Sequence, residues 1–161
     1  MITAFLNNFF SAAEVEKFIS VFKSEFLIAT WETIYVTLLS TLFAVIIGLP
    51  LGVLLVAGEK GGVRPLPSWL LWIIGTVINL LRSVPFLILM IMVIPLTRAI
   101  VGTSVGTVAS MVPLVIASFP FVARLAESSL REVNPNIIEA AQSMGATPMQ
   151  IITKVIIPES M

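Results

Sequence analysis

The chain contains no cysteine, no histidine and no aspartate, and charged residues make up only 11% of its 161 residues. Without cysteine these residues offer no disulfide and no thiolate metal site. Without histidine they offer no Ser-His-Asp or Cys-His nucleophilic device and no imidazole metal site. The nine acidic residues are scattered glutamates, and although counting leaves a catalytic pair open, no pattern suggests one. We therefore expect no metal, no cofactor and no covalent chemistry within this chain.

A basic surface is also lacking, because 9 Lys and Arg balance 9 Glu, so nothing attracts the phosphates of a nucleic acid. What is abundant is apolar: 58% of the residues are hydrophobic and the mean hydropathy is +1.07. A soluble domain has about 45–50% apolar and about 25% charged residues. Most of this chain must therefore face lipid or other membrane helices. This excludes a soluble enzyme, a disordered tail and a nucleic-acid binder.

Residues 1–30 are mixed in character and predict an amphipathic helix on the membrane surface. A signal peptide is not expected, because the start of the chain lacks Lys and Arg. We divide the chain into this N-terminal segment, residues 1–30, and a membrane domain, residues 31–161. The apolar side chains at helical spacing are Val15, Phe18, Ile19, Phe22 and Phe26.

The first of three apolar stretches, residues 34–57, predicts a membrane helix. At 1.5 Å per residue it extends about 36 Å, against a hydrocarbon layer of about 30 Å. Gly48 and Gly52 give it a small-xxx-small spacing that permits close helix approach. A kink at Pro50 without any special contact is the alternative. The glycine-rich turn that follows, residues 58–65, lacks the spacing of a phosphate-binding loop, so it predicts no ATP hydrolysis.

The second stretch, residues 66–96, predicts a single kinked crossing, because no hydrophilic loop separates its halves. The third covers about residues 105–126 and contains Pro113 and Pro120. Prolines inside membrane helices free carbonyl groups that neighbouring helices or a water-filled cavity must satisfy. Bent, packed helices of a conduit therefore fit better than a straight anchor. The predicted fold class is all-α, a polytopic membrane helical bundle with about three transmembrane helices.

One charge, Arg82, lies within the second stretch beside Asn79 and Ser83. An arginine at bilayer depth costs on the order of 2.5–3.5 kcal/mol on insertion scales. Our hypothesis is that Arg82 faces the transport pathway or a subunit interface. The alternative is that its side chain snorkels to the membrane interface.

The distribution of Lys and Arg predicts the orientation. With the N-terminus outside, five of these residues lie inside and three outside, which places residues 127–161 in the cytoplasm. The five predicted inside are Lys60, Arg64, Arg124, Arg131 and Lys154.

Residues 134–158 predict a helical hairpin. Asn134 can cap its first helix, and Gly145 can end that helix because glycine tolerates a left-handed backbone. Thr147 and Gln150 have the spacing of a capping box for the second helix, which we expect to end near Ile156, before Pro158. An ordinary hairpin on the membrane surface, without a partner, is an alternative from physics alone.

This run resembles the E-A-A-x-x-x-G-x9-I-x-L-P loop of ABC importer permeases. Across residues 31–161 the chain is similar to the methionine branch in particular, for example at residues 82–86 and 120–124. Val155 and Ile157 stand where Ile and Leu are usual. The matching residues are Glu139, Ala140, Ala141, Gly145 and Pro158.

The resemblance implies a bacterial cytoplasmic-membrane permease that forms a homodimer and docks on cytoplasmic ATP-binding subunits. An extracytoplasmic substrate-binding lipoprotein would deliver methionine, and the loop would act as a coupling helix. Because permeases of this branch continue through further membrane helices, we expect these 161 residues to be an incomplete permease. The residues expected to contact the ATPase are Glu139, Ala140, Ala141, Gly145, Ala146, Thr147 and Met149.

Three alternatives remain open from the sequence. A permease of the same architecture could carry another amino acid or small nutrient. An ion-driven carrier would need acidic residues inside its spans, but Glu59, in a turn, is the only acid between Thr33 and Ala123. A non-transporting membrane fragment would give no reason for the loop motif.

Overall fold

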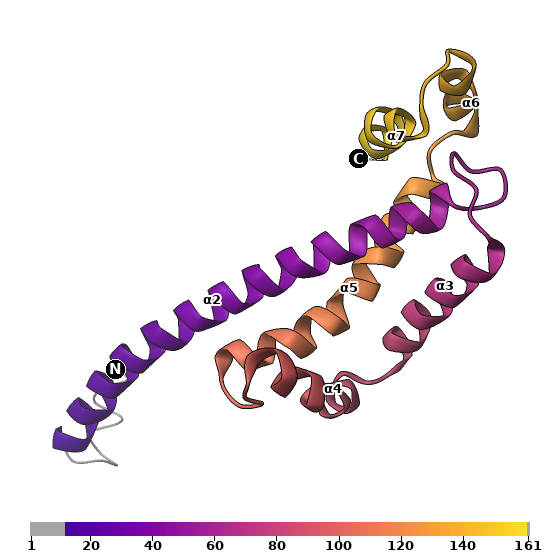
Figure 1. Ribbon diagram of the computed structural model, residues 1–161. Helices are drawn as coiled ribbons and strands as arrows, with labels where there is room; N and C mark the ends of the chain where they lie inside the picture. The colour runs from indigo at the N-terminus through magenta and orange to yellow at the C-terminus, as the bar shows by residue number, and fades with distance from the viewer. Residues whose placement is uncertain (1–11, 161) are drawn as a thin grey trace. The chain divides into compact units, whose positions relative to one another are not determined.

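The computed structural model describes residues 12–160, and the regular structure of this part is entirely helical (Figure 1). The chain divides into two compact units, residues 1–38 and residues 39–161. Helix α2, Ala12–Ala57, contributes to both units, and the remaining helices belong to the second. The predicted all-α fold class is confirmed for the described residues.

The described part of the first unit, residues 12–38, is helical throughout. The sequence predicted a surface helix followed by a separate span, but α2 continues past residue 30, because neither glycine nor proline occurs between Ala12 and Thr33. The rings of Phe22 and Phe26 stack with centroids 5.2 Å apart. The side chains of Val15 and Phe18, which carry part of the predicted amphipathic pattern, lie outside the described residues.

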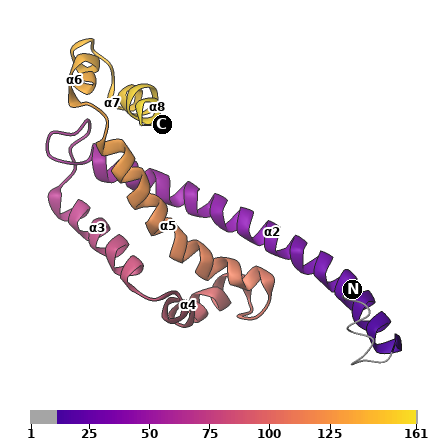
Figure 2. The ribbon, with the colours of Figure 1, turned by 180° about the vertical axis from the view of Figure 1, so that it is seen from behind.

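The second unit is built from the C-terminal half of α2 and three further apolar helices. These are α3, Ser68–Ser83; α4, Phe86–Val101; and α5, Thr107–Arg131. Figures 1 and 2 show α5 running beside the C-terminal half of α2, in the same direction. Both α3 and α4 pack against α5. Helix α5 is therefore the central element of this unit.

Two of the described helical segments are long and apolar enough to cross a membrane, Ile19–Ala57 and Thr107–Arg131. Helices α3 and α4 pass that test only as a pair, bent by 116°, so the described part has two candidate crossings, or up to three when the pair is one span. This agrees with about three predicted crossings. The bend is much sharper than the predicted kink, because the ring of Pro85 excludes the α conformation at Val84, which is extended with ψ 127°.

The contact between α2 and α5 is a seam of small residues. A Cβ atom added at Gly48 would lie 2.6 Å from the carbonyl oxygen of Phe119, and one added at Gly52 would lie 2.6 Å from that of Ala123. Only glycine lets two helix backbones approach this closely. The predicted close approach at Gly48 and Gly52 is therefore confirmed, and the plain-kink alternative at Pro50 is wrong.

Two buried clusters lie in the second unit. Leu55, Ile78 and Ala123 join α2, α3 and α5. The other cluster joins the end of α5 to the C-terminal helices described below, with Val53, Val56 and Val63 packed against it. Its buried members are Leu130, Val133, Ala141, Ile151 and Ile156.

Candidate functional site

The C-terminal hairpin begins with α6, Pro135–Ser143, and its ends are formed by local hydrogen bonds as the sequence predicts. The Asn134 side chain accepts a hydrogen bond from the backbone N–H of Asn136 at 3.0 Å. Gly145 has a φ of +78°, and its N–H donates to the carbonyl of Gln142, while the N–H of Ala146 donates to that of Ala141. This pair of bonds is a Schellman motif, which glycine favours. The predicted cap and the predicted stop are both confirmed.

The second helical segment starts with α7, Pro148–Ile151, and carries the predicted capping box. The N–H of Thr147 donates to Gln150 Oε1 at 2.9 Å, and the N–H of Gln150 donates to Thr147 Oγ1 at 3.4 Å. These reciprocal bonds satisfy two backbone donors that a bare helix start would leave unpaired. They also fix the direction in which the chain leaves the Gly145 turn.

The predicted end near Ile156 is wrong, because the helix continues through Pro158. A π-helical turn, η1, Ile152–Ile156, is followed by α8, Ile157–Glu159. The N–H of Ile157 donates to the carbonyl of Ile152, five residues back. Proline has no N–H and clashes with an ordinary α turn. The wider π turn admits Pro158 without ending the helix.

The hairpin, residues 134–160, has one packed face and one exposed face. Ala141 is 4% exposed and lies in the cluster at the end of α5, so it packs inward. At the opposite extreme, Met144 is 82% and Met149 66% exposed. Ala146 is half-buried. The other residues expected at an ATPase contact are all exposed: Glu139, Ala140, Gly145 and Thr147.

A charged cluster that sequence reasoning did not assemble lies beside the hairpin. Arg131 Nη2 donates to Glu59 Oε1 at 2.5 Å and to Glu127 Oε1 at 2.9 Å. Arg124 Nη1 donates to Glu127 Oε2 at 2.5 Å, and Arg124 Nη2 donates to the carbonyl of Gly75 at 3.2 Å. The side chain of Glu127 is only 8% exposed. These contacts connect the turn after α2, the end of α5 and the middle of α3.

Part of this cluster has a sequence signal. Arg124, Glu127 and Arg131 are spaced three and four residues apart, so their side chains share one face of a helix. Arg124 lies near the end of the predicted third crossing and within the α5 candidate span. Glu59 is 72 residues from Arg131, and no local pattern predicts their contact.

The structure brings Arg82 to a cavity of about 440 Å³ between α3 and α5, whose lining includes Arg124, Glu127 and Arg131. The side chain of Arg82 has no hydrogen bond or ion pair with any residue between 12 and 160. Its two predicted neighbours do not line this cavity, and Ser83 Oγ donates to the carbonyl of Asn79 at 2.8 Å. In the described part of the chain no group of three or more acidic side chains is placed to hold a metal ion.

Comparison with known proteins identifies the class. Residues 48–161 match the family described as the inner membrane component of binding-protein-dependent transport systems. Because this match covers more than half of the chain, the chain belongs to that family of membrane transport components.

Particular relatives refine this class. The chain is 52% identical over 136 residues to the probable D-methionine transport system permease protein MetI of Vibrio cholerae, covering 84% of this chain and 60% of that protein. It is 45% identical over 131 residues to the D-methionine transport system permease protein MetI of Escherichia coli, covering 81% and 60%. The chain thus spans about 60% of the length of these curated relatives.

Solved structures agree. A chain of the MetNI methionine ABC transporter, in an inward-facing conformation, superposes with a TM-score of 0.77 at 45% identity, over 81% of this chain and 60% of that one. An amino acid ABC transporter shares the fold, with a TM-score of 0.56 at 23% identity, over 94% of this chain and 65% of that one.

Proposed function

We propose that this chain is part of the permease subunit of an ATP-driven importer that moves methionine across the bacterial cytoplasmic membrane. The relatives named as D-methionine permeases and the MetNI transporter support the substrate. An importer of the same architecture for another amino acid is the alternative. Uptake of radiolabelled methionine, challenged with other unlabelled amino acids, separates the two.

The observation that carries the coupling part of this proposal is the hairpin's division into a packed and an exposed face. Its inner residues pack against the end of α5, against Val53 and Val56 in the last turns of α2, and against Val63 in the turn that follows α2. Its outer rim presents Met144 and Met149, together with Glu139. A separate ATP-binding subunit that received this rim in a groove would move the ends of two membrane helices together.

Ala141 supports the proposed contact surface from its packed inner side. Because it is buried, it does not touch the ATPase but supports the exposed residues on either side of it. Met144, which sequence reasoning did not include, joins the contact surface because it is the most exposed apolar residue of the hairpin. Glu139 would pair with a basic group of the partner.

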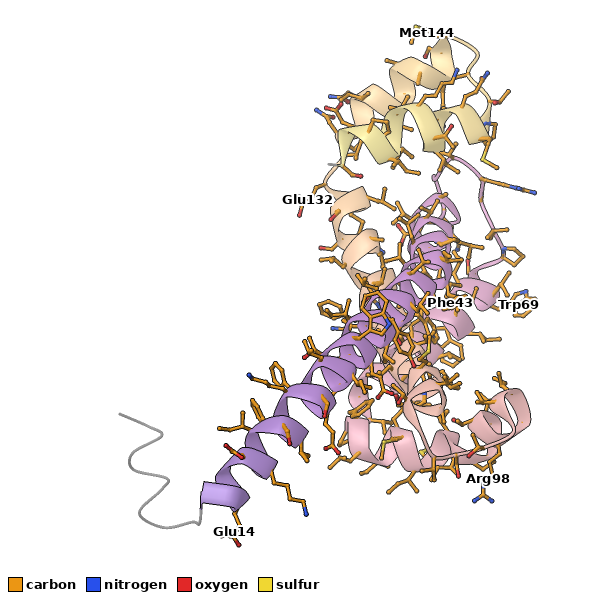
Figure 3. The ribbon with its side chains drawn as sticks, turned by 90° about the vertical axis from the view of Figure 1, so that its left-hand side faces the viewer. Glu14, Phe43, Trp69, Arg98, Glu132 and Met144 are labelled. Carbon is orange, nitrogen blue, oxygen red and sulfur yellow. The ribbon has the colours of Figure 1, made fainter. Side chains whose placement is uncertain are left out.

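In the orientation that we propose, the hairpin lies in the cytoplasm and the N-terminus lies outside. Figure 3 supports it, since Met144 and Arg98 lie at opposite ends of the second unit. A second copy of the permease would complete the pathway, and an extracytoplasmic binding lipoprotein would deliver substrate at the end that carries Arg98. The partner ATPase would bind and hydrolyse ATP, and lipid would cover the exposed apolar faces.

Within the span, Arg82 would face the pathway or the subunit interface. Its place in the wall of a cavity supports this role more than snorkelling into lipid headgroups does. Asn79 and Ser83, one turn apart on α3, would lie beside it at the end of the helix. Transport by an Arg82→Ala variant that equals transport by the unchanged protein would remove this role.

Gly145 offers the sharpest test of coupling. Proline fixes φ near −65°, which is incompatible with the φ of +78° at this position. In the complete transporter reconstituted in vesicles, Gly145→Pro should abolish ATP-driven uptake. Gly145→Asn is the matched control, because asparagine tolerates the left-handed conformation and should retain most uptake. Undiminished uptake by Gly145→Pro would contradict the proposal.

A further inference from the structure

Four charged side chains form a continuous path through the second unit. Glu59 lies in the turn after α2, and Arg131, Glu127 and Arg124 follow one face of the last turns of α5. The path ends at the carbonyl oxygen of Gly75, in the middle of α3. It therefore begins beside the hairpin and ends on a helix to which the hairpin is not directly joined.

Arg124 is the point where this path passes from one helix to another. Its guanidinium is shared, with Nη1 on the Glu127 carboxylate and Nη2 on the Gly75 carbonyl. Its third nitrogen, Nε, is buried and has no hydrogen-bond partner within residues 12–160, so the two Nη groups alone make its hydrogen bonds there. A Cβ at residue 75 would lie 3.5 Å from Nη2, an ordinary contact, so the bond to the carbonyl does not depend on glycine.

The two neighbours of α5 are held in different ways. Helix α2 meets it through backbone atoms at Gly48 and Gly52, where no adjustment is possible without separating the helices. Helix α3 meets it through the apolar contact of Ile78 and through the polar contact of Arg124. A hydrogen bond from a long side chain can keep its partner while the helices shift slightly, whereas a backbone seam cannot.

The far end of α3 leads into the 116° bend before α4, and Arg82 lies in its last turn. A displacement of α3 would therefore change both the bend and the cavity that Arg82, Arg124 and Arg131 line. The hairpin follows Arg131 directly in the sequence and packs against the same end of α5. A movement of the hairpin that displaced the end of α5 would therefore reach α3 through the charged path.

We propose that Arg124 is the positioning residue that transmits displacement of the hairpin from α5 to α3, while Glu127, Arg131 and Glu59 hold it in register. This inference rests on the proposed function, because it assumes that an ATPase moves the hairpin. These ion pairs would therefore transmit movement between helices, in addition to any contribution that they make to the stability of the fold.

Arg124→Lys is the variant that separates the two roles. A lysine keeps the positive charge beside Glu127, but its single ammonium group cannot bind that carboxylate and the Gly75 carbonyl in the fork-like arrangement of arginine. In the reconstituted transporter, ATP hydrolysis should stay within twofold of the unchanged protein. The amount of methionine moved per ATP hydrolysed should fall at least tenfold. The matched control is Arg98→Lys, because the Arg98 side chain donates to Ser104 and has no bond to the charged path among the described residues. This variant should leave the ratio unchanged.

The outcomes are separable. If the unchanged transporter shows no ATP-driven methionine uptake, the proposed function fails. If it does, and Arg124→Lys transports with the same ratio, the transmission role is overturned and the proposed function stands. Should Arg124→Lys fail to fold, Glu59→Gln replaces it, because Glu59 is exposed in a turn and the change removes the carboxylate charge that pairs with Arg131 at the start of the path. A normal ratio in folded Glu59→Gln would then overturn the inference.

A spectroscopic measurement reports the same coupling without transport. Spin labels are attached at Ser143→Cys and Thr76→Cys, both exposed positions, in a transporter whose other subunits and remaining permease residues carry no reactive cysteine; these 161 residues contain none. With the transmission intact, the distance between hairpin and α3 should keep one narrow distribution with and without nucleotide. Arg124→Lys should broaden or split it. Identical distributions in both proteins would contradict the inference.

Discussion

Gly52 of α2 lies so close to Ala123 of α5 that an added Cβ atom would come within 2.6 Å of the Ala123 carbonyl oxygen. Gly48 repeats this approach one turn earlier, against Phe119. The two glycines fix the separation of the helices that carry the hairpin. This contact, rather than a large apolar core, sets the distance between α2 and α5 at the end of the unit that we propose faces the cytoplasm.

Gly52→Ala should destabilise the chain, because its methyl group meets backbone atoms that move only with the whole helix. We expect a loss of about 1–3 kcal/mol, the usual range for an overpacked core site. Gly75→Ala is the matched control, since its Cβ would meet only Arg124 Nη2 at 3.5 Å. It should be neutral or stabilising by up to about 1 kcal/mol. Thermal unfolding in detergent measures both, and equal effects would refute the seam.

Removing the buried carboxylate of Glu127 should leave two arginines without their shared partner. We expect Glu127→Ala to cost about 2–3 kcal/mol, less than the about 3–5 kcal/mol of a fully buried pair, because Arg124 and Arg131 are partly exposed. Glu132→Ala, at an exposed glutamate nearby, should cost less than about 0.5 kcal/mol. Chemical unfolding in detergent gives both values. A cost for Glu127→Ala as small as that of Glu132→Ala would show that the cluster contributes nothing.

The capping box of the second hairpin segment should be measurable alone. Thr147→Ala removes the side-chain acceptor for the N–H of Gln150 and should cost about 1 kcal/mol. Backbone amides of residues 149–151 should then exchange with solvent several-fold faster. Thr147→Ser keeps the hydroxyl and should retain their protection. If Ala and Ser at this position gave the same exchange rates, the cap would not hold the helix start.

Pro158 should be the cause of the π-helical turn. Pro158→Ala restores an N–H at residue 158 and removes the ring, so residues 152–158 are free to adopt the ordinary α register. The chemical shifts of Ile152–Ile156 should move toward α-helical values while the helix is kept. Retention of the five-residue hydrogen bond from Ile157 to Ile152 would assign the π turn to tertiary packing instead.

The sequence predicted local features well where neighbouring residues alone determine them. Asn134, Gly145 and Thr147 act through bonds to residues within five positions, so their roles are readable from spacing. The Gly48 and Gly52 pattern predicted a close approach but not the partner helix. Apolar length predicted the existence of the first and third candidate spans, although the first begins earlier, at Ile19, and the third ends later, at Arg131.

Features that depend on distant or competing interactions were not predicted. The contact of Glu59 with Arg131 requires the fold, because 72 residues separate the two. The sharp α3–α4 bend and the helix through Pro158 are two opposite outcomes of proline. At Pro85 one helix ends and the chain changes direction before α4, whereas at Pro158 a preceding π-helical turn accommodates the ring and the helix continues. Spacing around a proline does not say which of these the surrounding packing will favour.

The most direct test of the proposed docking role is a photo-cross-link from the hairpin in membrane vesicles that contain the assembled transporter. A photoreactive amino acid replaces Met149 on the exposed rim, and in a separate protein it replaces Trp72, which is exposed on α3. We expect illumination to join Met149-substituted chains to the ATP-binding subunit, and Trp72-substituted chains to give no such product. A Met149 product with the extracytoplasmic binding protein, or with lipid alone, would contradict the account.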